Sequence, residues 1–382
     1  MRLILFRGSS LYGSVDRMLD SLAAAFAAQG DEAPIVDATR PDYAQALQQA
    51  IGAGPVDGFF GISGIGLDPR AEGNLYNALD KPFLSLYLDP LLLYWNQVAT
   101  PIRRRLIFTT APGDIDYWRG TLGLPVPMHH LPHAAAPLPP GATPVPWEDR
   151  NIEILMTGTA PEPPERLRAG WTQHGPAVTA RLNAMLETHD SDPFAPLPEI
   201  IAQVAQPVAS LGSPQSLHPY FQTLDRYLRA RMRWRMASAL CDRPLTLVGP
   251  GWERLTAAAP GFVRARLLGE RPAAEVAGLT ARAKLVVNSC TPYHGSHERL
   301  FQAMAAGAVA VTSATAWLEK TAPPDALVSW RQNEPLGERV DALLADAVAA
   351  ETIAENGRRW FEGAHCWHHR AAAIRTALAA LD

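Results

Sequence analysis

The sequence of 382 residues is poor in cysteine: it has three, Cys241, Cys290 and Cys366, which lie far apart. An odd and scattered set of cysteines argues against a disulfide framework. No apolar run approaches the ~20 residues that span a bilayer. The N-terminus also lacks the charged start, long apolar stretch and small-residue cleavage site of a secretory signal. We therefore expect a cytoplasmic protein with no transmembrane segment.

The sequence also lacks an excess of charge of either sign. The chain has 34 Lys and Arg against 38 Asp and Glu, a formal net charge of −4. Nucleic-acid binding needs clustered basic residues that displace counterions, so no nucleic-acid partner is expected. The hydrophobic fraction of 47% supports packed interiors, and the length predicts about two α/β domains.

The first part of the chain alternates buried-strand patterns with helical ones. The expected strands are Arg2–Phe6, Pro34–Asp37, Gly58–Ile62, Phe83–Leu88 and Leu106–Thr109. Such alternation indicates βαβ units and a parallel sheet with right-handed crossovers. Residues 1–140 are therefore predicted to form a Rossmann-like domain.

A proline-rich stretch, Ala134–Pro146, contains five prolines and one glycine and is predicted to be a linker. Residues 150–355 are predicted to form a second Rossmann-like domain, followed by a C-terminal helical part, 356–382, that packs back on the first. Its expected strands are Ile152–Thr157, Leu245–Val248, Val263–Leu268, Lys284–Asn288, Ala308–Thr312 and Ala326–Trp330. Ligands of such sheets bind beyond the carboxyl ends of the strands, here expected in a cleft between the domains.

The helix expected over Tyr220–Leu240 carries five arginines: Arg226, Arg229, Arg231, Arg233 and Arg235. Arginines among apolar residues usually form a solvated helix face, and that is the interpretation the sequence favours here.

The segment that follows Asn288 has the composition of an anion site. Ser296 can cap a helix whose first turn holds His297, Glu298 and Arg299. The free N–H groups and the positive end of such a helix favour phosphate. Gly295 would let the backbone approach an anion, and His294, His297 and Arg299 add donors, of which Arg299 can bind phosphate bidentately. Gln302, one turn after Glu298, could bind ribose hydroxyls.

The run Gly295–Ala308, GSHERLFQAMAAGA, resembles the donor-binding helix of group 1 glycosyltransferases of the GT-B type. It is most similar to the branch of the CgeB-like spore-maturation proteins, with Arg-x-Phe-Glu-Ala-x-Ala-x-Gly-Ala in that helix. Asp225, Tyr227 and Arg229 match its Asp-x-Tyr-x-Arg helix, Gly249–Trp252 matches its Gly-x-Gly-Trp turn, and Cys366-Trp367 with Arg370 matches its last helix. The resemblance covers roughly residues 150–380.

This resemblance implies a GT-B architecture and a hexosyltransferase-like enzyme. A sugar would move from a nucleotide-diphosphate donor to an unidentified acceptor (a glycan, protein or small molecule), without a metal or other cofactor. The donor site would comprise Gly158, Gly249, Gly251, His294, Gly295, Ser296, His297, Glu298, Arg299 and Gln302. His297 and Arg299 would stabilise the leaving diphosphate. Gln302 stands where the family has Glu, which leaves donor identity open.

A catalytic base is less well defined. Asp89, at the end of a strand, is the best-placed carboxylate to take the acceptor proton, and the imidazole alternatives are His129, His130 and His133. If the reaction retains configuration, the donor phosphate can assist and no protein base is needed.

Two patterns in the sequence are similar to metal sites, but a metal role is not favoured for either. Asp114-Ile115-Asp116 imitates the Asp-x-Asp metal motif of another glycosyltransferase fold but lies in a Rossmann-like domain. His365, Cys366, His368 and His369 contain zinc-ligand residue types, with His365 and His369 at helical spacing, but a packing role is favoured.

Two rival functions remain open. One is a GT-B-fold epimerase or phosphorylase. The other is a degenerate protein that binds a nucleotide sugar or a partner without catalysis, which the Gln302 departure motivates.

Overall fold

The chain folds into two compact units. The computed structural model describes residues 1–10, 13–67, 73–206, 208, 212–258 and 264–381. The first unit comprises Met1–Ala134, Ser213–His218 and His365–Asp382, and the second comprises Ala135–Gly212 and Pro219–Ala364. The first unit thus combines the start of the chain with its last helix.

The first unit is built on a six-stranded parallel sheet of order β2-β1-β3-β4-β5-β6. Its strands are β1 (Leu3–Arg7), β2 (Ile35–Asp37), β3 (Gly58–Ile62), β4 (Phe83–Tyr87), β5 (Arg105–Thr109) and β6 (Met128–His130). The five strands predicted from the sequence are present with ends shifted by a residue or so. The sixth, β6, was not predicted because its sequence, Met-His-His, contains no apolar run.

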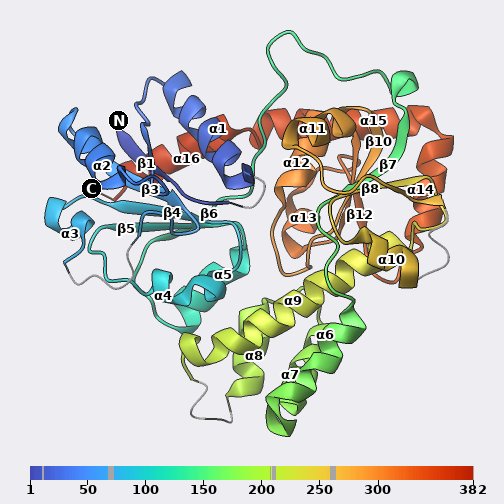
Figure 1. Ribbon diagram of the computed structural model, residues 1–382, viewed down its shortest axis with the longest axis horizontal. Coiled ribbons are helices and arrows are strands. Elements are labelled where there is room, and N and C mark those ends of the chain that lie inside the picture. The colour runs from blue at the N-terminus through green and yellow to red at the C-terminus, as the bar shows by residue number, and fades with distance from the viewer. Residues whose placement is uncertain (11–12, 68–72, 207, 209–211, 259–263, 382) are drawn as a thin grey trace. The chain divides into compact units, whose positions relative to one another are not determined.

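Helices cover both faces of this sheet (Figure 1). Alternate strand residues such as Leu3 and Leu5 pack with α1 (Ser14–Ala28) and α16 (Trp367–Ala379). Those between them, such as Ile4 and Phe6, pack with residues of α2 (Tyr43–Gly52) and α3 (Leu75–Leu79). Short helical segments follow β4 and β5: η2 (Leu91–Tyr94), α4 (Trp95–Val98), α5 (Pro112–Asp116) and η3 (Tyr117–Thr121). Burial on both faces explains the nearly continuous apolar strands.

The second unit contains another six-stranded parallel sheet, of order β12-β11-β10-β7-β8-β9. Its strands are β7 (Ile152–Thr157), β8 (Leu245–Val248), β9 (Arg266–Leu267), β10 (Ala283–Asn288), β11 (Val309–Ser313) and β12 (Val328–Trp330). Val263, the expected start of β9, lies outside the described residues. The other predicted strands are present to within two residues.

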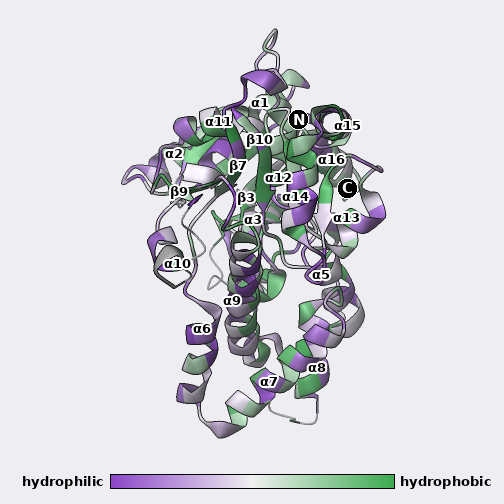
Figure 2. Ribbon diagram, turned by 90° about the vertical axis from the view of Figure 1, so that its right-hand side faces the viewer, coloured by the Kyte–Doolittle hydropathy of each residue, from purple (hydrophilic) through white to green (hydrophobic). Residues whose placement is uncertain are grey.

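The helices of the second unit enclose this sheet and extend beyond it. They are η4 (Trp147–Asp149), α6 (Pro164–Gly170), η5 (Trp171–His174), α7 (Pro176–Ser191), α8 (Leu197–Ala205), α9 (Pro214–Ser238), α10 (Trp252–Ala258), α11 (Ala273–Ala281), α12 (Glu298–Ala305), α13 (Ala316–Thr321), α14 (Leu336–Ala345) and α15 (Ala347–Ala364). The first turn of α9 belongs to the first unit. Figure 2 shows the strand β10 as apolar and the outer helix α6 as polar. In the part of the chain that the structure describes, no helix has both the length and the apolar character to cross a bilayer.

Candidate functional site

The second sheet has a topological switch point between β7 and β10. Chain order runs from β7 to β8 on one side, and β10 then pairs on the other side of β7. The connections that leave β7 and β10 therefore diverge, and doubly wound sheets bind ligands in the crevice this creates at the carboxyl ends of the strands. The candidate site is formed by Gly158–Ala160 after β7, Ser289–His297 after β10, and the helices α9 and α12.

Two glycine turns pack against each other beside this crevice. Gly158 has φ +114° and Gly249 has φ +125°, both in the region that favours glycine. A Cβ on Gly249 would lie 2.4 Å from the carbonyl oxygen of Gly158. Trp252 Nε1 donates to the same oxygen at 2.8 Å, and Ala160 N donates to Pro250 O at 3.0 Å. Gly249 thus lets the turn after β8 support the turn after β7, and its predicted ligand contact, like that of Gly251, stays a prediction.

Two arginines of α9 reach the loops of the site. Arg233 donates from Nε to Ser289 Oγ at 3.1 Å and from Nη1 to Thr159 O at 2.6 Å. Arg229 donates from Nη2 to His294 Nε2 at 3.1 Å. Burial, together with the positive charges of Arg299 and Arg229, lowers the pKa of Arg233 to about 9. Three guanidinium groups therefore lie close enough for their charges to oppose one another.

Arg299 is the third arginine and projects from the first turn of α12. Its guanidinium lies against Gly158, where a Cβ would meet Nη2 at 3.0 Å. Burial lowers the pKa of Arg299, partly offset by the charge of Glu298. Within the described residues, its guanidinium makes no hydrogen bond. A partly buried cation of this kind is costly unless an anion pairs with it.

The start of α12 differs from the sequence expectation. The helix begins at Glu298 and its N-cap is His297, whose Nδ1 accepts from Arg299 N at 3.2 Å. Ser296 is buried and is not the cap, so that prediction is wrong. Leu300 N donates to His297 O at 3.1 Å. Two backbone N–H groups that were expected to be free for phosphate are therefore already hydrogen-bonded. The cationic side chains are left as the principal hydrogen-bond donors to an anion.

A buried network holds the arginines in place. Asp225 accepts from Arg229 Nε at 2.7 Å and from Tyr293 Oη at 2.7 Å. Burial alone would raise the pKa of Asp225, but Arg229, with His294 and Tyr293, lowers it to about 2. Because a guanidinium only donates, His294 Nε2 is the acceptor in its contact with Arg229. His294 thus acts here by orienting Arg229.

The remaining predicted donor residues have identified neighbours. Gln302 Nε2 donates to Glu298 Oε1 at 2.7 Å, and Gly295 O accepts from Thr315 Oγ1 at 2.8 Å. Asn288, the last residue of β10, was not predicted. It is 3% exposed, and neither polar atom of its side chain has a hydrogen-bond partner among the described residues. A buried amide at this sheet edge requires a water or a ligand to satisfy it.

The arginine-rich helix is not a solvated face throughout. Arg226 and Arg235 are exposed, but Arg231 is buried and donates to Asp190 from both terminal nitrogens, at 2.9 and 2.5 Å. The sequence contains a signal that separates these groups. Asp225, Arg229 and Arg233 are spaced four residues apart and therefore share one helix face.

The candidate catalytic bases and the Asp-x-Asp motif of the first unit lie in different local environments. Asp89 is partly buried beyond the end of β4, which leaves its role as a base a prediction. Asp114 Oδ2 accepts from Leu91 N at 2.8 Å and from Thr109 Oγ1 at 3.2 Å, a structural use of the first carboxylate of the Asp-x-Asp motif. His129 and His130 lie on β6, and burial lowers the pKa of His130 to about 4. His133 is buried, and its carbonyl accepts from Arg370 at 2.7 Å.

Comparisons with known proteins agree with this arrangement. Residues 229–376 match the family model described as glycosyl transferase-like, a segment that includes Arg229, Arg233 and Arg299. No curated protein matches the sequence.

Solved structures of glycosyltransferases share the fold over the whole chain. Sucrose-phosphate synthase from Thermosynechococcus elongatus is 13% identical with a TM-score of 0.58, covering 100% of this chain and 99% of its own. HepE of Anabaena in complex with UDP is 12% identical, with a TM-score of 0.57 and full coverage of both chains. An α-glucosyltransferase in complex with UDP and DNA is 12% identical, with a TM-score of 0.59 and 99% coverage of each. At these identities the likeness establishes the GT-B fold, and with the matched family segment it supports a glycosyltransferase.

Proposed function

We propose that the protein transfers a hexosyl group from a nucleotide-diphosphate sugar to an acceptor hydroxyl, without a metal at the donor site. The observation that carries this proposal is the convergence of Arg229, Arg233 and Arg299 at the switch point of the second sheet, with the pKa of Arg233 lowered to about 9. A diphosphate would relieve the mutual repulsion of these cations and pair with them by charge-assisted hydrogen bonds.

The chemistry follows from where charge develops. As the bond between the sugar C1 and the diphosphate oxygen breaks, negative charge accumulates on the leaving diphosphate. Guanidinium groups fixed beforehand stabilise that charge without reorganisation. The acceptor oxygen forms the new bond to C1, and its proton passes to a base, for which Asp89 of the first unit is our candidate, or to the departing phosphate.

The nucleotide is proposed to be uridine diphosphate. HepE of Anabaena and an α-glucosyltransferase of the same fold are solved with UDP. We also place the chain nearest the CgeB-like branch, because the motif residues Asp225 and Arg229 form the ion pair that holds the cluster, at 2.7 Å. Asn288 and the paired Glu298 and Gln302 are proposed to contact the sugar or the ribose.

A thermal-shift titration with UDP and with UDP-glucose tests the proposal, because a ligand that binds only the folded state raises the melting temperature. Arg299→Ala should abolish the shift, whereas Arg226→Ala, an exposed arginine of α9, should retain it. If the Arg299 variant showed the same thermal shift as the wild type, the arginine cluster would not be the donor site. Transfer of sugar from UDP-glucose to a panel of acceptors then measures turnover.

A second function, nucleotide-sugar binding without catalysis, has one observation in its favour. Gln302 donates to Glu298 at 2.7 Å, whereas the Glu usual in the family would place two carboxylates together. Binding of UDP-glucose with no transfer and no hydrolysis, in both wild type and Gln302→Glu, would select this function over the enzyme. Release of free sugar or sugar phosphate without an acceptor product would select the epimerase or phosphorylase.

A further inference from the structure

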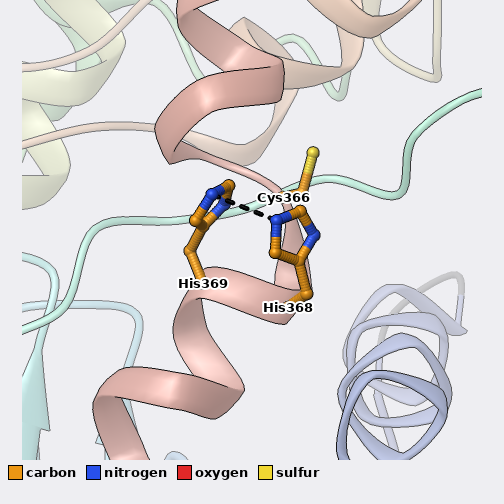
Figure 3. A group of neighbouring side chains, drawn as sticks. All are labelled: Cys366, His368 and His369. Carbon is orange, nitrogen blue, oxygen red and sulfur yellow. Dashed lines mark hydrogen bonds between the residues drawn. The ribbon is translucent and has the colours of Figure 1, made fainter. Parts of the chain in front are cut away.

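The start of α16 brings together three side chains that are all metal-ligand types. Cys366 is the N-cap of this helix, and His368 and His369 lie in its first turn. One ligand atom from each can be chosen so that all three lie within 4.8 Å of one another. Figure 3 shows the three side chains side by side, with the two imidazole rings facing each other.

The group contains three of the four residues of zinc-ligand type that the sequence suggested, and it leaves out His365. Helical spacing pointed to His365 and His369, but the helix begins only at Trp367. His365 instead lies before it, and its Nδ1 accepts from Arg370 Nη2 at 2.8 Å. Arg370 also donates to the carbonyls of Pro132 and His133. His365 is therefore occupied in tying the helix start to the segment after β6, and Cys366 takes the third position in the cluster.

The two imidazoles are in an arrangement that a metal ion would favour. Their Nε2 atoms are 3.0 Å apart and share a hydrogen bond, and this separation is near the value of about 3.3 Å for two nitrogens on one tetrahedral zinc ion. His369 Nδ1 is buried with no hydrogen-bond partner within the described part of the chain.

The exposure of the three side chains is compatible with entry of a metal ion and with its retention. His368 is exposed, His369 partly buried and Cys366 buried, so an ion can arrive from one side and lose solvent on the other.

We propose that Cys366, His368 and His369 bind a zinc ion, with water as the fourth ligand. One thiolate and two imidazoles are the ligand set that zinc shares with few other biological cations. Binding displaces the Cys366 thiol proton to solvent and forms one Zn–S and two Zn–N bonds. The ion clamps the residue before α16 to its first turn. It belongs to the first unit, so it takes no part in the donor chemistry proposed for the second.

Cobalt substitution tests this proposal in the full-length chain without an affinity tag. After chelator treatment, the wild type should bind one equivalent of Co²⁺ and develop a near-ultraviolet thiolate-to-cobalt charge-transfer band, which Zn²⁺ then displaces. Cys366→Ser should lose the band, and His369→Ala should bind Zn²⁺ at least ~10-fold more weakly. Cys241→Ser, a partly buried cysteine in no disulfide, should keep both properties.

Saturating Zn²⁺ should also raise the melting temperature of the wild type and leave that of Cys366→Ser unchanged. If Cys366→Ser does not fold, His368→Gln takes its place, because it changes an exposed ring. This variant should weaken Zn²⁺ binding at least ~10-fold, as expected for His369→Ala. Absence of binding near one equivalent, or a charge-transfer band that persists in the Cys366 variant, would overturn the proposal. Neither result depends on UDP binding, so the two proposals fail separately.

Discussion

Arg229 donates from Nε to the carboxylate of Asp225 at 2.7 Å, one turn earlier in α9. The pair is the anchor of the cationic cluster, because the same arginine also contacts His294 in the loop after β10. The lowered pKa of Asp225, about 2, shows that its charged form is strongly favoured in the folded protein.

Asp225→Asn should lower the free energy of unfolding at pH 7 by about 2 kcal/mol. A carboxyl whose pKa is depressed on folding stabilises the native state above its unfolded pKa, near 4. That contribution disappears as the pH falls through the folded value. The difference between wild type and variant in urea unfolding should therefore be full at pH 5 and shrink between pH 4 and 2. A difference that did not depend on pH would contradict this account, and Asp242→Asn, on the surface, serves as the matched control.

Arg233→Met should weaken UDP binding at least ~10-fold while changing the free energy of unfolding of the unliganded protein by less than about 1 kcal/mol. The variant loses hydrogen bonds to Ser289 and Thr159, but it also removes a partly buried cation beside two others. Isothermal titration with UDP and urea unfolding measure the two effects. Arg226→Met changes an exposed position of the same helix and should alter neither. A large stability loss in Arg233→Met would mean that the residue is structural.

Gly249→Ala should lower the free energy of unfolding by about 3 kcal/mol, because it combines a strained φ with contact to a carbonyl. The added Cβ would stand 2.4 Å from Gly158 O, and this backbone cannot yield as a flexible side chain does. Gly278→Ala is the control. Gly278 lies in α11, and no atom of the described residues lies within 4 Å of a Cβ added there, so alanine should stabilise the protein by about 0.5–1 kcal/mol. Equal effects at the two positions would refute the close approach of the turns.

Asn288→Val should leave the melting temperature of the unliganded protein unchanged or higher, because neither polar atom of the buried amide has a hydrogen-bond partner among the residues that the structure describes. If the amide contacts the donor, the same change should reduce the thermal shift produced by UDP-glucose. Thermal unfolding with and without the ligand measures both. A marked drop in the melting temperature without ligand would show that the amide already has a structural water.

Much of the fold was predictable, and the reasons are local. Strands buried on both faces leave continuous apolar runs such as Leu285–Val287, and the helix after β10 has a recognisable sequence. The site was less predictable, because its geometry depends on contacts between distant segments. The sequence cannot show that Arg233 reaches Thr159 O, 74 residues away, or that His297 rather than Ser296 caps α12. It also cannot separate the Cys366 cluster from His365, since that depends on the residue at which α16 begins.

The central position of β7 limits how the chain can be shortened. The matched family segment starts at Arg229, yet β7 pairs with β10 on one side and with β8 on the other. A fragment cut to residues 229–376 would lose the middle strand and leave two unjoined halves, β12-β11-β10 and β8-β9, each with an open edge. Such a fragment should aggregate rather than fold. Any minimal donor-binding version of this protein must therefore retain the chain from Ile152 onward.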